Sequence, residues 1–183
     1  VYMQLKQDAD GHDLDPADPD NWTVPTPIYR NDASLLNGNK QLAATASGGV
    51  GMSLDMTYFQ DADGRSYYAW QQLGATYIAT MDPKDPAHVT SSPVRIVTPE
   101  YAWNAAIAEG PNVTLRDGKL YLMFSGSGVG KTYTTGLAVA DASGTDLTDP
   151  ASWTVLNYPI QKSGPFNGEM QLGTGHGMWS EDE

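Results

Sequence analysis

The chain has 183 residues, enough for one domain with a hydrophobic core, and its formal net charge at pH 7 is −12. This charge argues against a nucleic-acid backbone or an anionic membrane surface as partner and favours a neutral or cationic ligand. The absence of cysteine excludes disulfides and thiolate metal sites. It leaves the compartment open, because cytoplasmic and secreted bacterial proteins can both lack cysteine.

The first predicted element is a strand over residues 1–7, and an acidic loop over Asp8–Asp15 follows it. The loop resembles a calcium-binding loop, but its glycine comes too early for an EF-hand and no helical pattern flanks it. We therefore expect a solvated turn.

A phrase of the form Asp-Pro-x-x-Trp-Thr-Val occurs at Asp18–Val24 and returns at Asp149–Val155, with a weaker copy at Asp82–Pro86. Neighbouring copies are roughly 65 residues apart, which accommodates about four short strands with their turns. A spacing of this size is typical of repeat architectures.

A second phrase, an Asp-Gly turn followed by an aromatic-rich strand, occurs at Asp61–Trp70 and Leu115–Phe124. Residues 180–183 resemble the start of a third. Asp-Gly favours tight hairpins because both residues tolerate positive φ. Repeated hairpins at this spacing predict an all-β propeller. We expect residues 1–30 to end one blade, 50–100 and 105–160 to form two more, and 170–183 to begin a fourth.

In the second hairpin we expect a strand to begin at Asn112, which leaves Glu109 at the hairpin mouth before Gly110 and Pro111. Another strand is predicted over residues 133–140. The stretch before it, residues 126–132, faintly resembles a phosphate-binding loop. The motif's first glycine would have to stand at Ser125, and no helix pattern follows, so we expect no nucleotide and no organic cofactor.

Three polar residues precede the three hairpins: Asp55, Glu109 and His176. Taken alone, each is more often a solvated or structural residue. In a propeller, however, the innermost strands line a central channel, so corresponding positions converge near the axis. The sequence therefore predicts an acidic pocket with a histidine beneath it.

The motifs together resemble glycoside hydrolase family 43. They are Ser-Leu-Asp before Asp-Ala-Asp-Gly-Arg, Glu-Gly-Pro before Asp-Gly-Lys-Leu-Tyr-Leu-Met-Phe-Ser, and then Gly-Thr-Gly-His-Gly. The resemblance covers most of the chain and implies a five-bladed β-propeller, present here as roughly three blades. It also implies an inverting hydrolase acting on arabinose- or xylose-containing glycans, with α-L-arabinofuranosidase activity expected first and β-xylosidase activity next.

Under this resemblance Glu109 matches the general acid, and Asp55 matches the carboxylate that orients the acid and tunes its pKa. His176 matches the histidine beside a metal, commonly calcium; direct ligation and a purely structural role remain equally open. Trp103 is a candidate sugar-stacking residue. Trp70 and Trp179 offer similar rings, although core packing is the alternative for all three and the favoured one for Trp70.

One departure from the family pattern concerns the general base, an aspartate expected on the first blade. We expect it upstream of Val1 and do not assign it to Asp13, Asp15 or Asp18. The chain then resembles an internal piece of a propeller that needs the rest of its domain or another chain and is inactive alone. The alternative is a non-catalytic carbohydrate-binding or assembly piece.

Overall fold

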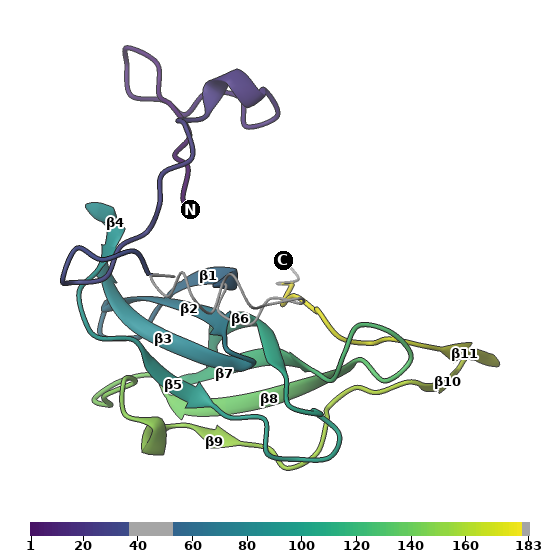
Figure 1. Cartoon of the computed structure of the whole chain (residues 1–183). Helices are drawn as coiled ribbons and strands as arrows, with labels where there is room; N and C mark the ends of the chain where they lie inside the picture. The colour runs from purple at the N-terminus through teal and green to yellow at the C-terminus, as the bar shows by residue number, and fades with distance from the viewer. Residues whose placement is uncertain (37–52, 181–183) are drawn as a thin grey trace.

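The computed structural model describes residues 1–36 and 53–180 (Figure 1). Its regular structure is β-strand, apart from two single-turn 3-10 helices, η1 (Pro19–Asn21) and η2 (Pro150–Ser152). Within these described ranges no helix is long and apolar enough to cross a membrane. The all-β prediction is confirmed.

The first sheet is antiparallel in the order β1-β2-β3-β4, with β5 also paired to β3. Its strands are β1 (Leu54–Gln60), β2 (Ser66–Gln72), β3 (Ala75–Asp82), β4 (Asp85–Val89) and β5 (Val94–Val97). All five lie inside the range predicted for one blade. The Asp-Gly turn at Asp63-Gly64 joins β1 to β2 as expected, and Gly64 supplies the positive φ of 80°.

The second sheet is antiparallel in the order β6-β7-β8-β9. Its strands are β6 (Ala108–Arg116), β7 (Lys119–Gly126), β8 (Thr134–Asp141) and β9 (Thr154–Val155). The turn between β6 and β7 has φ of 50° at Asp117 and 74° at Gly118, as an Asp-Gly hairpin requires. The strand predicted to begin at Asn112 begins at Ala108 instead, because a bulge lets the pairing with β7 continue past Gly110 and Pro111.

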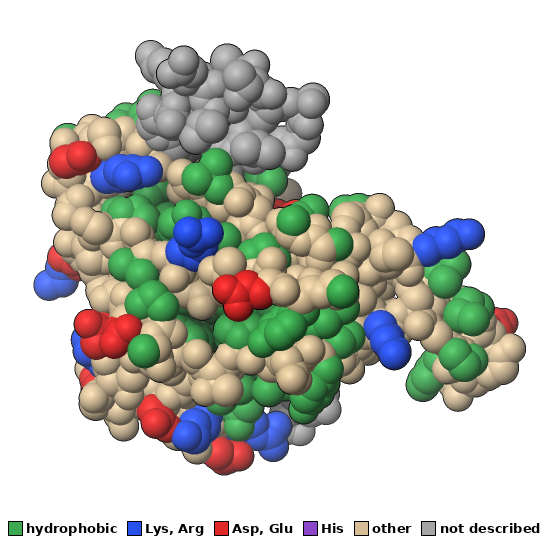
Figure 2. Space-filling model, turned by 60° about the horizontal axis from the view of Figure 1, so that its bottom comes forward, with side chains coloured by type: hydrophobic (Ala, Val, Ile, Leu, Met, Phe, Trp, Pro, Cys, Tyr) green, Lys and Arg blue, Asp and Glu red, His purple; other side chains and the backbone are tan. Residues whose placement is uncertain are grey.

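A two-stranded ribbon, β10 (Gly164–Phe166) and β11 (Glu169–Gln171), stands out from the second sheet (Figure 1), and Figure 2 shows hydrophobic side chains along it. The N-terminal residues form an arm that projects from the top of the molecule in Figure 1. The strand predicted over residues 1–7 is wrong in detail, since this segment pairs only through isolated bridges at Tyr2, Leu5 and Gln7. The third predicted hairpin lies mostly in residues 181–183, outside the described residues.

The two sheets pack face to face around one hydrophobic core. The first sheet contributes Phe59, Tyr67 and Ile78, and the second contributes Leu122 and Phe124, all of them buried. Phe59 and Tyr67 stack with ring centroids 5.2 Å apart. Burial of this apolar surface is the main force holding the sheets together.

The two copies of the Asp-Pro-x-x-Trp phrase adopt the same local structure. In each copy the aspartate caps a single 3-10 turn, and the tryptophan N–H bonds to the carbonyl of the proline. The indole Nε1 then donates six residues back, from Trp22 to Pro16 at 3.0 Å and from Trp153 to Leu147 at 2.9 Å. The weaker copy at residues 82–86 is a turn between β3 and β4 instead.

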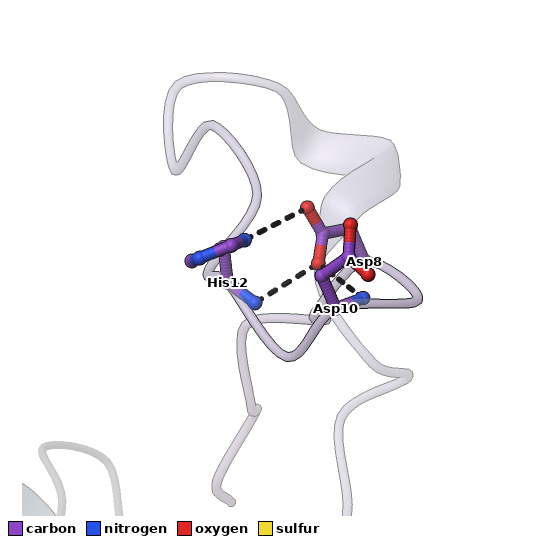
Figure 3. Close-up of side chains that lie close together, drawn as sticks. All are labelled: Asp8, Asp10 and His12. Atoms are coloured by element: carbon purple, nitrogen blue, oxygen red, sulfur yellow. Dashed lines mark hydrogen bonds and ion pairs between the residues drawn. The ribbon is translucent and has the colours of Figure 1, made fainter.

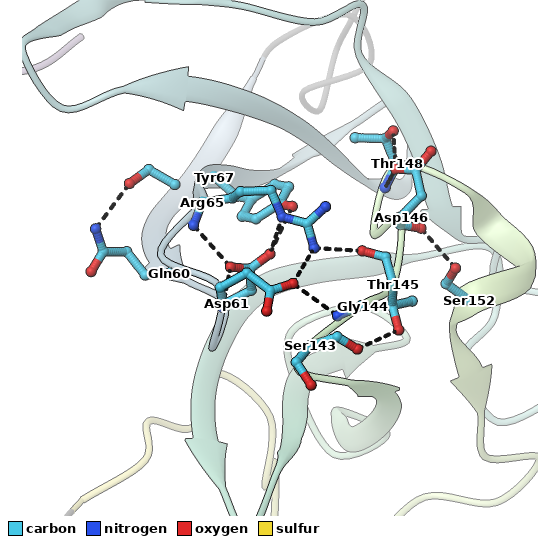
Figure 4. Close-up of polar contacts among 12 residues, drawn as sticks. Gln60, Asp61, Arg65, Tyr67, Ser143, Gly144, Thr145, Asp146, Thr148 and Ser152 are labelled. Atoms are coloured by element: carbon cyan, nitrogen blue, oxygen red, sulfur yellow. Dashed lines mark hydrogen bonds and ion pairs between the residues drawn. The ribbon is translucent and has the colours of Figure 1, made fainter.

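A group of polar contacts, the clamp, ties the β1–β2 turn to the segment after β8 (Figure 4). The Asp61 carboxylate is fully buried and pairs with the Arg65 Nε at 2.6 Å. The Arg65 Nη2 donates to the Thr145 carbonyl at 2.7 Å, and Asp63 Oδ2 accepts from the Gly144 N–H at 2.8 Å. These bonds fix the two sheets to each other far from the residues described next.

Candidate functional site

The site lies where β1 and β6 each carry a one-residue bulge. On β1 the bulge falls between Leu54 and Thr57, and on β6 it falls between Glu109 and Asn112. The two bulges match, which makes Asp55 equivalent to Gly110, one residue beyond Glu109. Their φ values are 55° and 57°. A non-glycine residue in this left-handed region is strained, and such strain tends to collect at functional sites.

Asp55 reaches across from the first sheet to the second. Its Oδ2 accepts a hydrogen bond from the Gly110 N–H at 3.2 Å. The carboxylate of Asp55 is therefore held beside the peptide that carries Glu109. The fold brings these two acidic residues together, since they stand 54 positions apart in the sequence.

The half-buried Glu109 side chain is held by a tyrosine from the segment that leads into β8. The Tyr133 hydroxyl donates to Glu109 Oε1 at 2.8 Å. Burial raises the pKa of Tyr133 to about 12, and the hydrogen bond and negative charge of Glu109 act in the same direction, whereas a hydrogen bond with Ser125 opposes them. Tyr133 consequently remains a hydrogen-bond donor at every pH near neutrality.

His176 joins the same group through its backbone and its ring. Its N–H donates to Ser125 Oγ at 2.5 Å, and its Nδ1 lies 3.3 Å from the Tyr133 hydroxyl oxygen. A Cβ built on Gly110 would stand only 3.1 Å from the same Nδ1. The structure thus brings Asp55, Glu109 and His176 together around Gly110.

Sequence reasoning missed Tyr133 and Ser125. Ser125 is opposite Glu109 in the β6–β7 register, and Thr135 is opposite Ser125 in the β7–β8 register. Counting the predicted hairpin outward from its turn, where Arg116 pairs with Lys119, would place Gly126 opposite Glu109, and only the bulge moves the partner to the neighbouring Ser125. Tyr133 carries no comparable signal, because it precedes β8 and its contact with Glu109 depends on how the sheet twists.

The candidate aromatic residues make contacts typical of packing. Trp103 stacks on Tyr101 and Phe124 with ring centroids 6.2 Å and 6.0 Å apart, and its Nε1 donates to the Asn157 carbonyl at 3.1 Å. Trp70 is fully buried. Trp179 is half-buried and donates through Nε1 to the Asn112 and Tyr121 carbonyls. The sugar-stacking role of Trp103 stays a prediction that these contacts do not strengthen.

Beside His176 the described contacts are a ring nitrogen and a tyrosine hydroxyl, and they leave the predicted calcium ion a prediction. Calcium takes six to eight oxygen ligands, whereas His176 offers nitrogen, and its contact at the ring is a tyrosine hydroxyl. Across residues 1–36 and 53–180, the side chains close enough together to hold a metal ion are those of Asp8, Asp10 and His12 (Figure 3).

That N-terminal cluster is an exposed turn, as the sequence predicts. Asp8 Oδ1 accepts from the N–H groups of Asp10 and His12, each at 2.9 Å. The hydrogen bond from His12 is the main cause that lowers the pKa of Asp8. The carboxylate is engaged in holding its own loop, which accounts for the cluster without an ion.

Comparisons with known proteins agree with this architecture. The sequence model described as Glycosyl hydrolases family 43 matches residues 39–183. An extracellular exo-α-(1→5)-L-arabinofuranosidase of Streptomyces chartreusis is 32% identical over 142 residues, which is 72% of this chain and 41% of that protein. α-L-Arabinofuranosidase 43 of Humicola insolens is 31% identical over 72% of this chain and 28% of its own length.

Solved structures give the same result. The crystal structure of an α-L-arabinofuranosidase from Lactobacillus brevis superposes with a TM-score of 0.66 and 26% identity, over 96% of this chain and 54% of that one. A thermostable family-43 glycoside hydrolase has a TM-score of 0.57 and 25% identity, over 69% of this chain and 44% of that one.

The fold is thus that of a glycoside hydrolase β-propeller, present here as an incomplete set of blades. The chain belongs to glycosyl hydrolases family 43. The predictions of the family and of the propeller fold are confirmed. The chain spans less than half the length of the curated relatives cited above.

Proposed function

We propose that this chain is part of a glycoside hydrolase that removes α-L-arabinofuranosyl residues from plant-type glycans. The names of the relatives in Streptomyces, Humicola and Lactobacillus support this substrate class. Removal of β-xylosyl residues is the second candidate, because a xylan β-1,4-xylosidase from Bacillus halodurans shares the fold.

The observation that carries the proposal is the arrangement around Glu109. Its carboxyl group is oriented by Tyr133 at 2.8 Å, and the carboxylate of Asp55 is fixed beside it through Gly110. A carboxyl group placed in this way is suited to act as a general acid that protonates the departing glycosidic oxygen. Asp55 is placed to orient the peptide that carries this acid, because its carboxylate accepts the Gly110 N–H.

The resemblance to the family implies an inverting mechanism. In that mechanism a second carboxylate takes a proton from a water molecule, and the water oxygen attacks the anomeric carbon from the face opposite the leaving group. The bond from the anomeric carbon to the glycosidic oxygen breaks as Glu109 delivers its proton. The released sugar therefore has the inverted anomeric configuration.

We propose that the general base comes from outside this chain, from further blades or another chain. Three aspartates of the N-terminal arm are poor candidates because their carboxylates are engaged locally. Asp13 accepts from the Gln7 side chain, Asp15 from the Ala17 N–H and Asp18 from the Asp20 N–H. Figure 1 shows that arm projecting away from β6. A complete propeller would also pair strand edges that are otherwise prone to association.

A calcium ion near His176 remains a proposal that the described residues do not carry by themselves. Water molecules or residues outside the described ranges would have to supply its oxygen ligands. No step of the mechanism is assigned to it. Activity assays with and without a chelator, followed by calcium readdition, test it: a loss that calcium restores would show that the activity depends on calcium, and an unchanged activity would contradict the proposal.

The test of the proposed function uses a polypeptide that carries this chain within a complete propeller. Glu109→Gln keeps the side-chain shape but removes the transferable proton, so hydrolysis of an arabino-oligosaccharide should fall by about two to four powers of ten. Proton NMR of the wild-type reaction should show the inverted sugar first. Retention of configuration would contradict the mechanism, and unchanged rates in Glu109→Gln would contradict the assignment of the acid.

The 183-residue chain alone provides the complementary test. It should not turn over an aryl arabinofuranoside, because one oriented acid without a base does not complete the reaction. Robust hydrolysis by the isolated chain would overturn the proposal that the base lies elsewhere. A carbohydrate-binding piece without catalytic function would instead bind oligosaccharide and give no hydrolysis even in the complete propeller.

A further inference from the structure

Tyr133 is held more tightly than an ordinary surface tyrosine. Its side chain is buried, its N–H bonds to the Gly130 carbonyl at 3.1 Å, and its carbonyl accepts from the Thr174 N–H at 3.0 Å. A Cβ built on Gly175 would lie 2.5 Å from the ring. Only glycine therefore allows the backbone at position 175 to press against this ring.

This contact explains why the Gly-Thr-Gly-His motif contains glycines. In Gly-Thr-Gly-His the first glycine, Gly173, has φ of 71° and would place a Cβ 2.9 Å from the Gly130 carbonyl oxygen. The second glycine, Gly175, lies against the Tyr133 ring. The histidine, His176, then brings its Nδ1 to 3.3 Å from the tyrosine hydroxyl. The turn at residues 173–176 therefore fixes the position of the Tyr133 side chain.

The held hydroxyl group reaches one oxygen of Glu109. It donates to Oε1 at 2.8 Å. Within the described ranges, Oε2 accepts no hydrogen bond from another residue. In the tautomer of His176 with its proton on Nδ1, the ring donates to the tyrosine oxygen and keeps the hydroxyl hydrogen directed at Glu109.

We propose that Tyr133 is a positioning residue for the reaction, because it occupies Oε1 and so confines the transferable proton of Glu109 to Oε2. In a carboxylic acid the carbonyl oxygen accepts a hydrogen bond better than the hydroxyl oxygen, so the tyrosine hydroxyl favours Oε1 as the carbonyl oxygen and Oε2 as the protonated one. The proton passes from Oε2 to the glycosidic oxygen, whose bond to the anomeric carbon breaks. Once Glu109 is ionised, the same hydroxyl stabilises the resulting carboxylate. This inference rests on the proposed role of Glu109.

The test removes the hydroxyl alone. In a polypeptide with the complete propeller, Tyr133→Phe keeps the ring against Gly175 and should retain the fold. For an oligosaccharide with a poor leaving group, kcat should fall about 10- to 100-fold, the effect expected when one hydrogen bond to a charged group is lost. KM should change by less than about twofold, because binding of the ground state is not altered.

The decisive comparison is the double variant Glu109→Gln with Tyr133→Phe. If Tyr133 acts only through the acid, the double variant should be no slower than Glu109→Gln alone, since groups that act as a unit are not additive. A further 10-fold loss in the double variant would show a structural role and would overturn the proposal. So would an unchanged kcat in Tyr133→Phe.

A matched control is Tyr67→Phe, which removes the hydroxyl that donates to the buried Asp61 at 3.1 Å. It should lower stability but leave kcat within about twofold of the wild type, because Asp61 is far from Glu109 along both sheets. The two hypotheses also fail separately. If Glu109→Gln loses activity equally on natural and activated substrates, the proposed acid role of Glu109 is wrong; if Glu109→Gln loses more activity on the natural substrate but Tyr133→Phe leaves kcat unchanged, only the role of Tyr133 is wrong.

Discussion

Among residues 1–36 and 53–180, two buried tyrosines donate to a carboxylate, and the difference between them separates structure from function. In the clamp, Tyr67 donates to Asp61 Oδ2 at 3.1 Å; in the site, Tyr133 donates to Glu109 Oε1 at 2.8 Å. Each tyrosine has its pKa raised to about 12, chiefly by burial. The hydroxyl groups are therefore equivalent donors.

The two carboxylates differ in what else they bind. Asp61 Oδ1 accepts from the N–H groups of Asp63 and Arg65, while Oδ2 accepts from the Arg65 side chain and Tyr67. Both oxygens are thus fully used. Glu109 is only half-buried, and its Oε2 has no partner among residues 1–36 and 53–180. A carboxylate with all its acceptors filled is a structural anchor, whereas one oriented through a single oxygen keeps the other for chemistry.

The largest effect expected from this comparison is a loss of stability when the carboxylate of the clamp is removed. Asp61→Asn removes the buried partner of Arg65 and should lower the free energy of unfolding by about 3 kcal/mol, the low end for breaking a buried ion pair, because Arg65 is partly exposed. Urea unfolding of the polypeptide that carries the complete propeller measures this change. In the complete propeller, kcat should stay within about twofold of the wild type at a temperature where the variant is folded. A large loss of kcat with intact stability would erase the distinction between the two carboxylates.

At the site we expect the reverse of the clamp variant: a loss of kcat with little change in stability. Asp55→Asn keeps an oxygen to accept the Gly110 N–H but removes the negative charge beside Glu109. We expect kcat to fall about 10- to 100-fold with a change in unfolding free energy below about 1 kcal/mol. Asp63→Asn is the matched control, since Asp63 carries an equivalent charge in the clamp, and it should leave kcat unchanged.

The smallest effect concerns stability at high pH. Because the folded chain raises the pKa of Tyr67 and Tyr133 from about 10 to about 12, the unfolded chain loses these protons first. Their contribution to stability is fully present below pH 10 and is lost as the pH rises towards 12. Urea midpoints from pH 9 to 11.5 should fall less steeply in Tyr67→Phe than in the wild type. Parallel curves would show that burial of Tyr67 has no such consequence.

The sequence predicted those parts of the fold that local chemistry determines. Asp-Gly turns specify the β1–β2 and β6–β7 hairpins, and the aspartate of each Asp-Pro-x-x-Trp copy caps the same 3-10 turn. The β6 bulge was missed because Gly110 and Pro111 usually interrupt a strand. Here they continue it, since the partner strand β7 sets the register.

The candidate site was predictable in its members but not in its contacts. Repeat position singles out Asp55, Glu109 and His176, although the bulges make Gly110 rather than Glu109 the equivalent of Asp55. Tyr133 is beyond such reasoning, because it meets Glu109 across the sheet and is held there by Gly175. The same limit applies to the clamp: the turn at Asp61 is readable from sequence, whereas the burial of its carboxylate depends on the second sheet.

The central claim, that Glu109 delivers its proton to the leaving group, is tested most directly by a series of aryl arabinofuranosides with leaving groups of increasing pKa. In the complete propeller, kcat/KM of Glu109→Gln should fall steeply as the leaving-group pKa rises, because the departing oxygen is no longer protonated. The wild type and the Asp61→Asn control should show a shallow dependence. Equal slopes for Glu109→Gln and the wild type would contradict the account.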